Sequence, residues 1–161
     1  MKHLALSIGL MAITGQAAAL SCARPDPVST FERLAAEPDA TYVVLLGELG
    51  FDASLLPQGV ENRARDPDPI TAIFQGHGLG YDGFTVVQDR TITLQSTCAG
   101  PWCGSAAPDR TLLMFAQIED DNLTVVAGPC GGRIFAPSDT AIDAMQACIN
   151  GNCPTSTPRF K

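Results

Sequence analysis

The chain has 161 residues and a formal net charge of −7 at pH 7, with 17 Asp and Glu against 10 Lys and Arg. This acidic balance argues against nucleic acid as a partner, because a nucleic-acid-binding surface needs clustered Lys and Arg side chains. The length allows one domain with a hydrophobic core of its own.

Residues 1–19 have the three regions of a secretory signal peptide. Lys2 supplies the positive charge, residues 4–14 are almost wholly apolar, and Ala17 to Ala19 are the small residues that signal peptidase reads. We therefore predict a signal peptide over residues 1–19 and Leu20 as the mature N-terminus. The predicted destination is the periplasm or the extracellular space, with no membrane span, because the apolar run is shorter than the about 20 residues of a spanning helix.

Two alternatives stay open for this end of the chain. The first is a buried N-terminal helix, although nothing caps the apolar run and it leads straight into a cysteine and a proline. The second is a lipoprotein signal with acylation at Cys22. Ser21 is the small residue that such a signal places before the cysteine, but Ala19 is not the aliphatic residue expected three positions before it.

Six cysteines follow the predicted signal: Cys22, Cys98, Cys103, Cys130, Cys148 and Cys153. In an exported chain this number indicates three disulfides, and sequence alone allows fifteen pairings of six cysteines. A zinc site is disfavoured because the mature chain has one histidine, His77, and no CxxC pair. We predict no metal and no cofactor.

The first predicted element after a proline-rich entry over residues 22–28 is a short helix. Ser29 and Glu32 have the spacing of a capping box at its start, and Pro38 closes it. The apolar face consists of three residues: Phe31, Leu34 and Ala35.

Strands dominate the middle of the chain. Tyr42–Glu48 is apolar on both faces, which predicts a central strand. Asp52–Asp68 is polar with two prolines and predicts a mobile loop. Ile70–Phe74 predicts a second strand, and the glycines of Gly76–Gly83 predict repeated bends in a curled sheet.

Further strands are predicted at Phe84–Val87 and Thr91–Thr97. The clearest local pattern is a hairpin in which Leu112–Ile118 and Leu123–Ala127 flank Glu119–Asn122 as a four-residue loop.

A second helix is predicted to begin at Pro137 and Ser138 and to end at Gly151. Its apolar face consists of Ile142, Met145 and Ile149. Residues 154–161 are predicted to form a disordered tail. About five strands and two short helices predict a mainly β domain over residues 20–153, closed as a small barrel.

The polar groups that could carry chemistry each have a simpler structural interpretation. A phosphate-binding loop at Gly76–Gly83 would need a helix directly after it, and His77 has no activated serine or cysteine in a known motif, so it is interpreted as a loop histidine. Glu119–Asp121 lacks the spacing of a calcium loop, and Asp66 and Asp68 are interpreted as solvated loop residues. Nothing indicates paired carboxylates for glycoside hydrolysis, and we predict that the protein is not an enzyme.

Cys98–Gly104 is the most distinctive segment of the sequence. A redox dithiol would normally have CxxC spacing, whereas four residues including a glycine and a proline separate Cys98 from Cys103. This spacing suits a tight loop closed by a local disulfide. Trp102, the only tryptophan, is interpreted as packing over that disulfide, with a ligand contact as the alternative.

Three short motifs occur in the order of a known family. They are the proline-rich opening Leu20–Pro27 followed by Phe31, then Cys103-Gly104 with the strand Leu112–Ile118, and then Leu123–Val126 leading to Cys130. Over most of residues 20–130 they resemble the netrin-like domain of tissue inhibitors of metalloproteinases. Cys98, Trp102 and the turn at residues 128–131 also resemble uncharacterised bacterial proteins of this group. The resemblance implies a small closed five-stranded OB-like barrel, stapled by disulfides.

The resemblance also implies which cysteines pair. Cys22 matches the family's second cysteine, whose partner corresponds to Cys130. The family's first cysteine is replaced here by Leu20, so Cys103 lacks its family partner and Cys98 stands nearby. The implied pairs are Cys22–Cys130, Cys98–Cys103 and Cys148–Cys153.

The replacement of the family's first cysteine by Leu20 also changes the functional expectation. In the family inhibitors the first mature residue is a cysteine whose amine and carbonyl chelate the protease zinc, and Leu20 stands at that position here. We therefore predict an exported, non-enzymatic binding module whose ligand is a protein or a small extracytoplasmic molecule. The alternative is a metalloproteinase inhibitor acting through its N-terminal edge, which consists of Leu20, Ser21, Cys22, Ala23, Arg24 and Pro25. An enzyme is the third hypothesis.

Overall fold

The computed structural model describes residues 20–23, 25–57 and 66–155. The predicted signal peptide, part of the predicted mobile loop and most of the predicted tail lie outside these residues. Two α-helices are present, α1 (Pro27–Ala35) and α2 (Asp139–Ile149), with one 3₁₀ turn, η1 (Ala53–Leu55). The strands are β1 (Thr41–Gly50), β2 (Ile70–Gly80), β3 (Gly83–Val87), β4 (Arg90–Ser96), β5 (Cys98–Ala99), β6 (Trp102–Cys103), β7 (Thr111–Glu119), β8 (Asn122–Ala127) and β9 (Ile134–Phe135).

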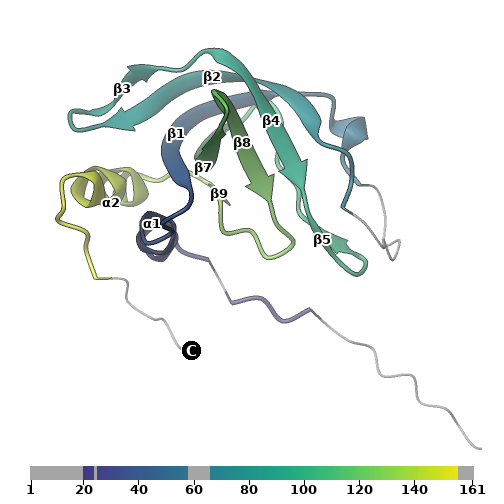
Figure 1. Ribbon diagram of the computed structural model, residues 1–161, viewed down its shortest axis with the longest axis horizontal. Coiled ribbons are helices and arrows are strands. Elements are labelled where there is room, and N and C mark those ends of the chain that lie inside the picture. Colours follow the sequence, from purple (N-terminus) through teal and green to yellow (C-terminus); the bar gives the residue numbers. More distant parts are fainter. Residues whose placement is uncertain (1–19, 24, 58–65, 156–161) are drawn as a thin grey trace, which may run out of the picture.

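Five strands close into a barrel in the order β1-β2-β4-β8-β7, with β7 pairing back onto β1 (Figure 1). All neighbours are antiparallel except β4 and β8, which run parallel. The prediction of a mainly β, closed five-stranded OB-like barrel with two short helices is thereby confirmed. Closure leaves none of these five strands as a long free edge, which is how barrels remove sites of edge-to-edge aggregation.

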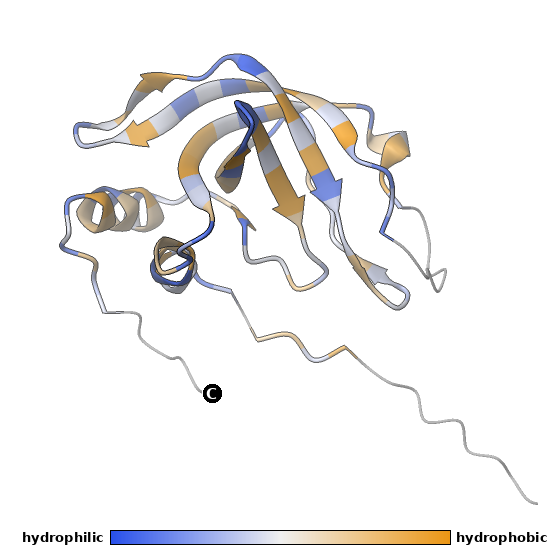
Figure 2. Cartoon of the chain, viewed as in Figure 1, coloured by the Kyte–Doolittle hydropathy of each residue, from blue (hydrophilic) through white to orange (hydrophobic). Residues whose placement is uncertain are grey.

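The barrel interior is filled by every second side chain along the strands. Along β2, Ile70, Ala72 and Phe74 are buried whereas the residues between them are exposed, and β4 repeats the pattern through Ile92 and Leu94. Figure 2 shows this alternation as bands of apolar and polar colour along the strands. Each large side chain buried in this way contributes roughly 1.5–3 kcal/mol.

A second apolar layer lies outside the barrel, where α1 and α2 cover one side of it (Figure 1). β1 serves both layers: Leu45 and Leu49 belong to the barrel interior, whereas Val44 belongs to the cluster on the helix side. From the helices, Leu34 of α1 and Met145 of α2 complete the second cluster. This explains why the sequence of β1 is apolar on both faces.

Facing glycines on β1 and β2 allow the sheet to coil tightly. A Cβ added at Gly47 would lie 2.3 Å from the Gln75 carbonyl oxygen and 2.7 Å from the Gly76 Cα. The two strands therefore approach each other more closely than side chains would permit. The prediction of repeated bends over Gly76–Gly83 is wrong in detail, because β2 continues to Gly80 and only Tyr81 and Asp82 make the turn into β3.

Three other local predictions need correction. The cap of α1 is Asp26, whose carboxylate accepts the Val28 and Ser29 N–H groups, so the helix begins at Pro27 and not at a Ser29–Glu32 capping box. The β7–β8 connection is a two-residue turn, since Glu119 pairs with Asn122.

In that turn Asp120 and Asp121 have φ values of 45° and 65°, the left-handed conformation whose twist matches the flanking strands. The predicted mobile loop also begins with ordered structure, because the Asp52 carboxylate accepts the Ser54 N–H and caps η1. Ser138 caps α2 by accepting the Ala141 N–H, and Gly151 follows its end with φ 77°, both as predicted.

The structure joins the same three cysteine pairs that the resemblance implied: Cys22–Cys130, Cys98–Cys103 and Cys148–Cys153. The first spans 108 residues of sequence and each of the others spans 5. No cysteine is left free in the described part of the chain.

Candidate functional site

The N-terminal edge is held against the barrel by one disulfide. Cys22 is bonded to Cys130, with their Cα atoms 5.3 Å apart. Ser21, Cys22 and Ala23 are exposed, whereas Leu20 and Pro25 are half-buried; Arg24 lies outside the described residues. The disulfide uses the Cys22 sulfur that acylation of a lipoprotein would need. The structure therefore places a short, tethered and accessible segment at the predicted site.

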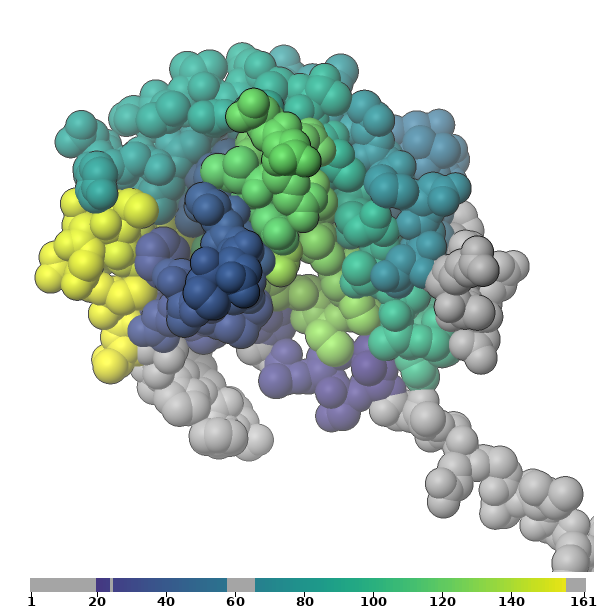
Figure 3. All heavy atoms as spheres, in the orientation of Figure 1, coloured from purple at the N-terminus to yellow at the C-terminus, as the bar shows by residue number. Residues whose placement is uncertain are grey.

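The connection from β8 to β9 forms the floor beneath this edge. Gly131 and Gly132 have φ values of 71° and 98°, which glycine adopts at little cost. A Cβ at Gly131 would lie 3.3 Å from the Pro25 Cγ, so a side chain there would press against the edge. Figure 3 shows the edge lying across one end of the molecule, against this connection.

The β5–β6 hairpin stands at the same end of the barrel. The Thr97 N–H donates to the Ala127 carbonyl at 2.9 Å, and the Gly104 N–H donates to the Thr97 carbonyl at 2.9 Å. A Cβ at Gly104 would lie only 2.0 Å from the Ala127 carbonyl oxygen, so glycine is required at the base of the hairpin. Trp102 lies in β6 with 38 % of its surface exposed.

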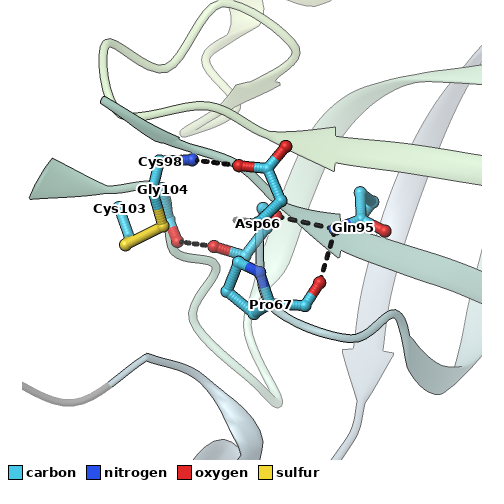
Figure 4. Close-up of a disulfide and its surroundings, with 7 residues drawn as sticks. Asp66, Pro67, Gln95, Cys98, Cys103 and Gly104 are labelled. Carbon is cyan, nitrogen blue, oxygen red and sulfur yellow. Dashed lines mark hydrogen bonds between the residues drawn. A yellow bond between two sulfur atoms is a disulfide. The ribbon is translucent and has the colours of Figure 1, made fainter. Parts of the chain in front are cut away.

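A carboxylate from the opposite loop fixes this hairpin. Asp66 accepts the Cys98 N–H at 2.8 Å, and the Gln95 side-chain amide donates to the Pro67 carbonyl at 2.9 Å (Figure 4). The interpretation of Asp66 as a merely solvated loop residue is therefore wrong. Its partner is 32 residues away in sequence, so no local pattern could have shown the contact.

The described groups at this end are main-chain atoms, small side chains, the Asp66 carboxylate and the partly exposed Trp102 ring. Cys103 is bonded to Cys98, and none of the described disulfides anchors a residue before Cys22. Within the described ranges, no three His, Cys, Asp or Glu side chains gather as a metal site. None of the helices described here is long and apolar enough to cross a bilayer.

The outer wall of the barrel, away from the helices, presents a second candidate surface. We define the barrel face by its outward residues on β2, β4 and β8: Thr71, Ile73, Gln75, His77, Thr91, Thr93, Gln95 and Thr124. Strand register places Thr71 opposite Thr93, and Thr93 opposite Thr124, so three hydroxyl groups form one row across three strands. The Asn122 side-chain amide donates to the Thr93 hydroxyl at 2.8 Å, which orients the middle of this row.

His77 belongs to this face and not to a loop, which corrects the sequence interpretation. It lies in β2 opposite Val87, with its side chain exposed. In the part of the chain that the structure describes, no serine, cysteine or carboxylate hydrogen-bonds to its imidazole. The arrangement of a histidine-activated nucleophile is therefore not assembled around it.

One polar cluster had no signal in the sequence. The Tyr42 hydroxyl lies 2.5 Å from a Glu37 carboxylate oxygen, and the Arg133 guanidinium donates to it at 3.2 Å while lying 5.1 Å from the ring centroid. Partial burial and the hydrogen bond to Glu37 raise the pKa of Tyr42 above its ordinary value, against the opposing charge of Arg133. The Arg133 Nη1 is buried and has no partner among the described residues.

Tyr42 also borders a cavity of about 350 Å³ between α1, α2 and β1. Its walls are mostly apolar and include Phe31, Leu34, Leu79 and Ile149. The Tyr42 cluster thus ties the end of α1 to the barrel beside an incompletely filled part of the helix layer.

Comparisons with known proteins do not assign the chain to a family. No family model, no curated protein and no solved structure matches it.

Proposed function

We propose that this protein is an exported, non-enzymatic binding module that holds its ligand on the barrel face. The observation that carries the proposal is the in-register row Thr71–Thr93–Thr124 on the part of the wall opposite the helices. Hydroxyl groups fixed on paired strands form a rigid set of donors and acceptors. Ile73, with 59 % of its surface exposed, adds an apolar contact beside them.

Other features agree with a binding role outside the cytoplasm. Three disulfides are typical of an oxidising compartment and stiffen a small domain. The barrel interior is filled by side chains, so ligands can reach only its outer wall and rims. The same fold supports many functions, so the ligand class follows from the face. This face is hydrogen-bonding and partly apolar, with the Glu119 carboxylate accepting the Thr124 hydroxyl at 3.4 Å at one end of the row.

The experiment is a titration of the ¹⁵N-labelled mature protein with a panel of neutral oligosaccharides and uncharged peptides. We expect amide shifts at Thr71, Thr91 and Thr93, and loss of binding in Thr71→Arg and Thr91→Arg, which place bulky charges on the face. Thr140→Arg on the exposed surface of α2 is the matched control. Binding that survives both face variants, or chemical conversion of a bound compound, would overturn the proposal.

A second function has one specific observation in its favour. The Cys22–Cys130 disulfide holds the N-terminal edge at the rim, as an inhibitor that inserts its N-terminus into a protease would need. Leu20 lies two residues outside this anchor, so its amine is less preorganised for zinc, which weakens binding. A mature chain beginning at Cys22 would instead carry its amine directly on the anchored residue.

Three versions of the protein separate the two functions. Chains beginning at Leu20, at Cys22, and at an alanine added before Leu20 are compared as inhibitors of a zinc-dependent endopeptidase. Inhibition by the Leu20 form that disappears on adding alanine supports the inhibitor. Equal behaviour of all three, with ligand binding at the barrel face unchanged, removes the inhibitor and leaves the binding module.

A further inference from the structure

β3 is the one substantial strand of the described sheet that has a partner on only one side. It pairs with the C-terminal part of β2, from His77 to Gly80, whereas β4 pairs with β2 only from Ile70 to Phe74. Its other edge faces away from the barrel. Val86 and Val87 on this strand are 48 % and 65 % exposed.

The hydrogen-bond pattern shows which groups of this edge are unpaired. The Gln88 N–H donates to the Gly76 carbonyl at 3.0 Å, so this position is a hydrogen-bonded pair. Antiparallel ladders alternate, so the next pair, His77 with Val87, is a non-hydrogen-bonded one. The N–H and C=O of Val87 therefore point away from β2, toward the free edge.

The edge accepts only a short partner. Leu79 pairs with Phe84 and Gly78 with Val86, which leaves Thr85 as an extra residue in a β-bulge. Bulges twist an edge and prevent long regular pairing with other strands. The regular part of the edge is thus limited to the residues around Val87.

The charge around the edge is negative at both ends. Asp82 precedes β3, and Asp89, whose carboxylate accepts the Gly76 N–H at 3.0 Å, follows it. Arg90 is the sole Lys or Arg between positions 66 and 109. The Arg90 guanidinium donates to the Asp121 carbonyl, which also brings the acidic β7–β8 turn to this end. A partner segment with basic residues at its ends complements this pattern.

The same charges disfavour a second copy of this chain. Pairing of two β3 edges would bring together two segments that each carry Asp82 and Asp89 and have no Lys or Arg between these positions. A basic segment is attracted to this edge, whereas an identical acidic one is not. The partner is therefore a different polypeptide.

We propose that the β3 edge binds a short extended segment of another protein by strand addition, with β-branched residues in its centre and Lys or Arg at its ends. Main-chain pairing at Val87 supplies the affinity, and the flanking acids select the basic ends. The proposal is independent of ligand binding on the barrel face.

The probe is the peptide acetyl-Lys-Val-Thr-Val-Thr-Lys-amide, titrated into the ¹⁵N-labelled mature protein. We expect amide shifts over residues 85–89. A peptide N-methylated at both valines and both threonines has no central N–H left to donate to the edge, whichever of its own edges faces β3, and should bind at least about fivefold more weakly. A peptide with Glu in place of both Lys should also bind more weakly.

Variants of the protein test the same edge. Val87→Pro removes the outward N–H and should weaken binding, whereas the matched control Val87→Thr keeps this N–H and should retain it. Asp82→Lys should reverse the preference between the Lys and Glu peptides. If Val87→Pro fails to fold, binding of the N-methylated peptide to the unaltered protein still tests whether main-chain pairing at β3 holds the peptide.

Three outcomes would overturn the proposal. These are equal binding of the N-methylated peptide, shifts that map away from β3, and absence of binding at millimolar peptide. A dimer of the unaltered protein in sedimentation, dissociated by Val87→Pro, would assign the edge to a second copy instead.

Discussion

The barrel interior and the helix layer are built from similar apolar side chains, but they are closed in different ways. In the interior, Leu45, Phe74 and Met114 are all 0 % exposed, and hydrogen-bonded strands surround them on every side. The helix layer rests on one side of the barrel, has many partly buried members and contains the cavity of about 350 Å³.

The positions of the disulfides correspond to this difference between the barrel interior and the helix layer. None of them lies within the barrel interior. One ties the segment before α1 to the β8–β9 connection, one joins the last turn of α2 to the segment after it, and one closes the β5–β6 hairpin. A closed barrel is stabilised by its own ladder and core, whereas short helices at the ends of the chain have few long-range contacts. Covalent links are therefore found where packing alone holds the chain least.

The largest expected loss of stability is for a phenylalanine of the barrel interior, compared with a phenylalanine of the helix layer. Phe74→Ala in the interior should lower the free energy of unfolding by about 3–5 kcal/mol. Phe135 is half-buried, and its ring packs edge-on against the Phe115 ring with 6.0 Å between the ring centroids. Phe135→Ala should therefore lower the free energy of unfolding by only about 1–3 kcal/mol. Urea unfolding of both variants measures the difference, and equal losses would mean that the two layers are equally tightly packed.

The disulfides should rank by the length of chain that they close. Replacing Cys22 and Cys130 by serine, across a separation of 108 residues, should cost roughly 4–5 kcal/mol in the chain-entropy model. Replacing Cys148 and Cys153, across 5 residues, should cost roughly 2 kcal/mol. Thermal unfolding of the two double variants provides the test, and a reversed order would show that local packing around α2 outweighs loop closure.

The cap of α1 should make part of the helix layer sensitive to acid. Partial burial acts to raise the pKa of Asp26, but hydrogen bonds from Ser29 and Val28 outweigh it, so this pKa lies below its ordinary value. The resulting stability is present above about pH 3.9 and is lost as pH falls through the lower folded pKa.

Asp26→Ala should cost about 1 kcal/mol at neutral pH and less in acid. Asp26→Asn is the matched control, because it retains a capping oxygen without the titration. The measurement is urea unfolding of each variant from pH 7 downward. A cost for Asp26→Ala that does not change with pH would contradict the ionised cap.

The smallest effect concerns the link between the helix layer and the barrel. Because its pKa is raised, Tyr42 should ionise above the ordinary value of about 10 in an absorbance titration of the folded protein. Its contribution to stability is present below that value and is lost as pH rises through the folded pKa. Tyr42→Phe should remove the high-pH step and cost about 1 kcal/mol. Tyr81→Phe, at an exposed position, is the control and should leave the step in place.

Prediction from sequence succeeded where the signal was local. The apolar alternation of Ile92 and Leu94 marked β4, and Ser138 with Gly151 marked both ends of α2. The approximate strand positions and the barrel class followed from such patterns. The disulfide pairing followed from resemblance and not from spacing, because the six cysteines by themselves left every pairing open.

Prediction failed where a long-range contact decides local structure. The glycines of β2 suggest turns by propensity, but Gly47 on β1 lets the strand continue through Gly76. Asp66 and Tyr42 gave no signal because their partners, Cys98 and Arg133, are 32 and 91 residues away.

By itself, the sequence determined both helices and the approximate positions of the longer strands, because periodicity and caps act within a few residues of the chain. Only the tertiary structure decided which strands close the barrel, that β4 and β8 run parallel, and that β3 keeps a free edge. It also decided which outward residues meet as one row on the barrel face. These features depend on register between distant strands, and register is set by the packing of the whole core.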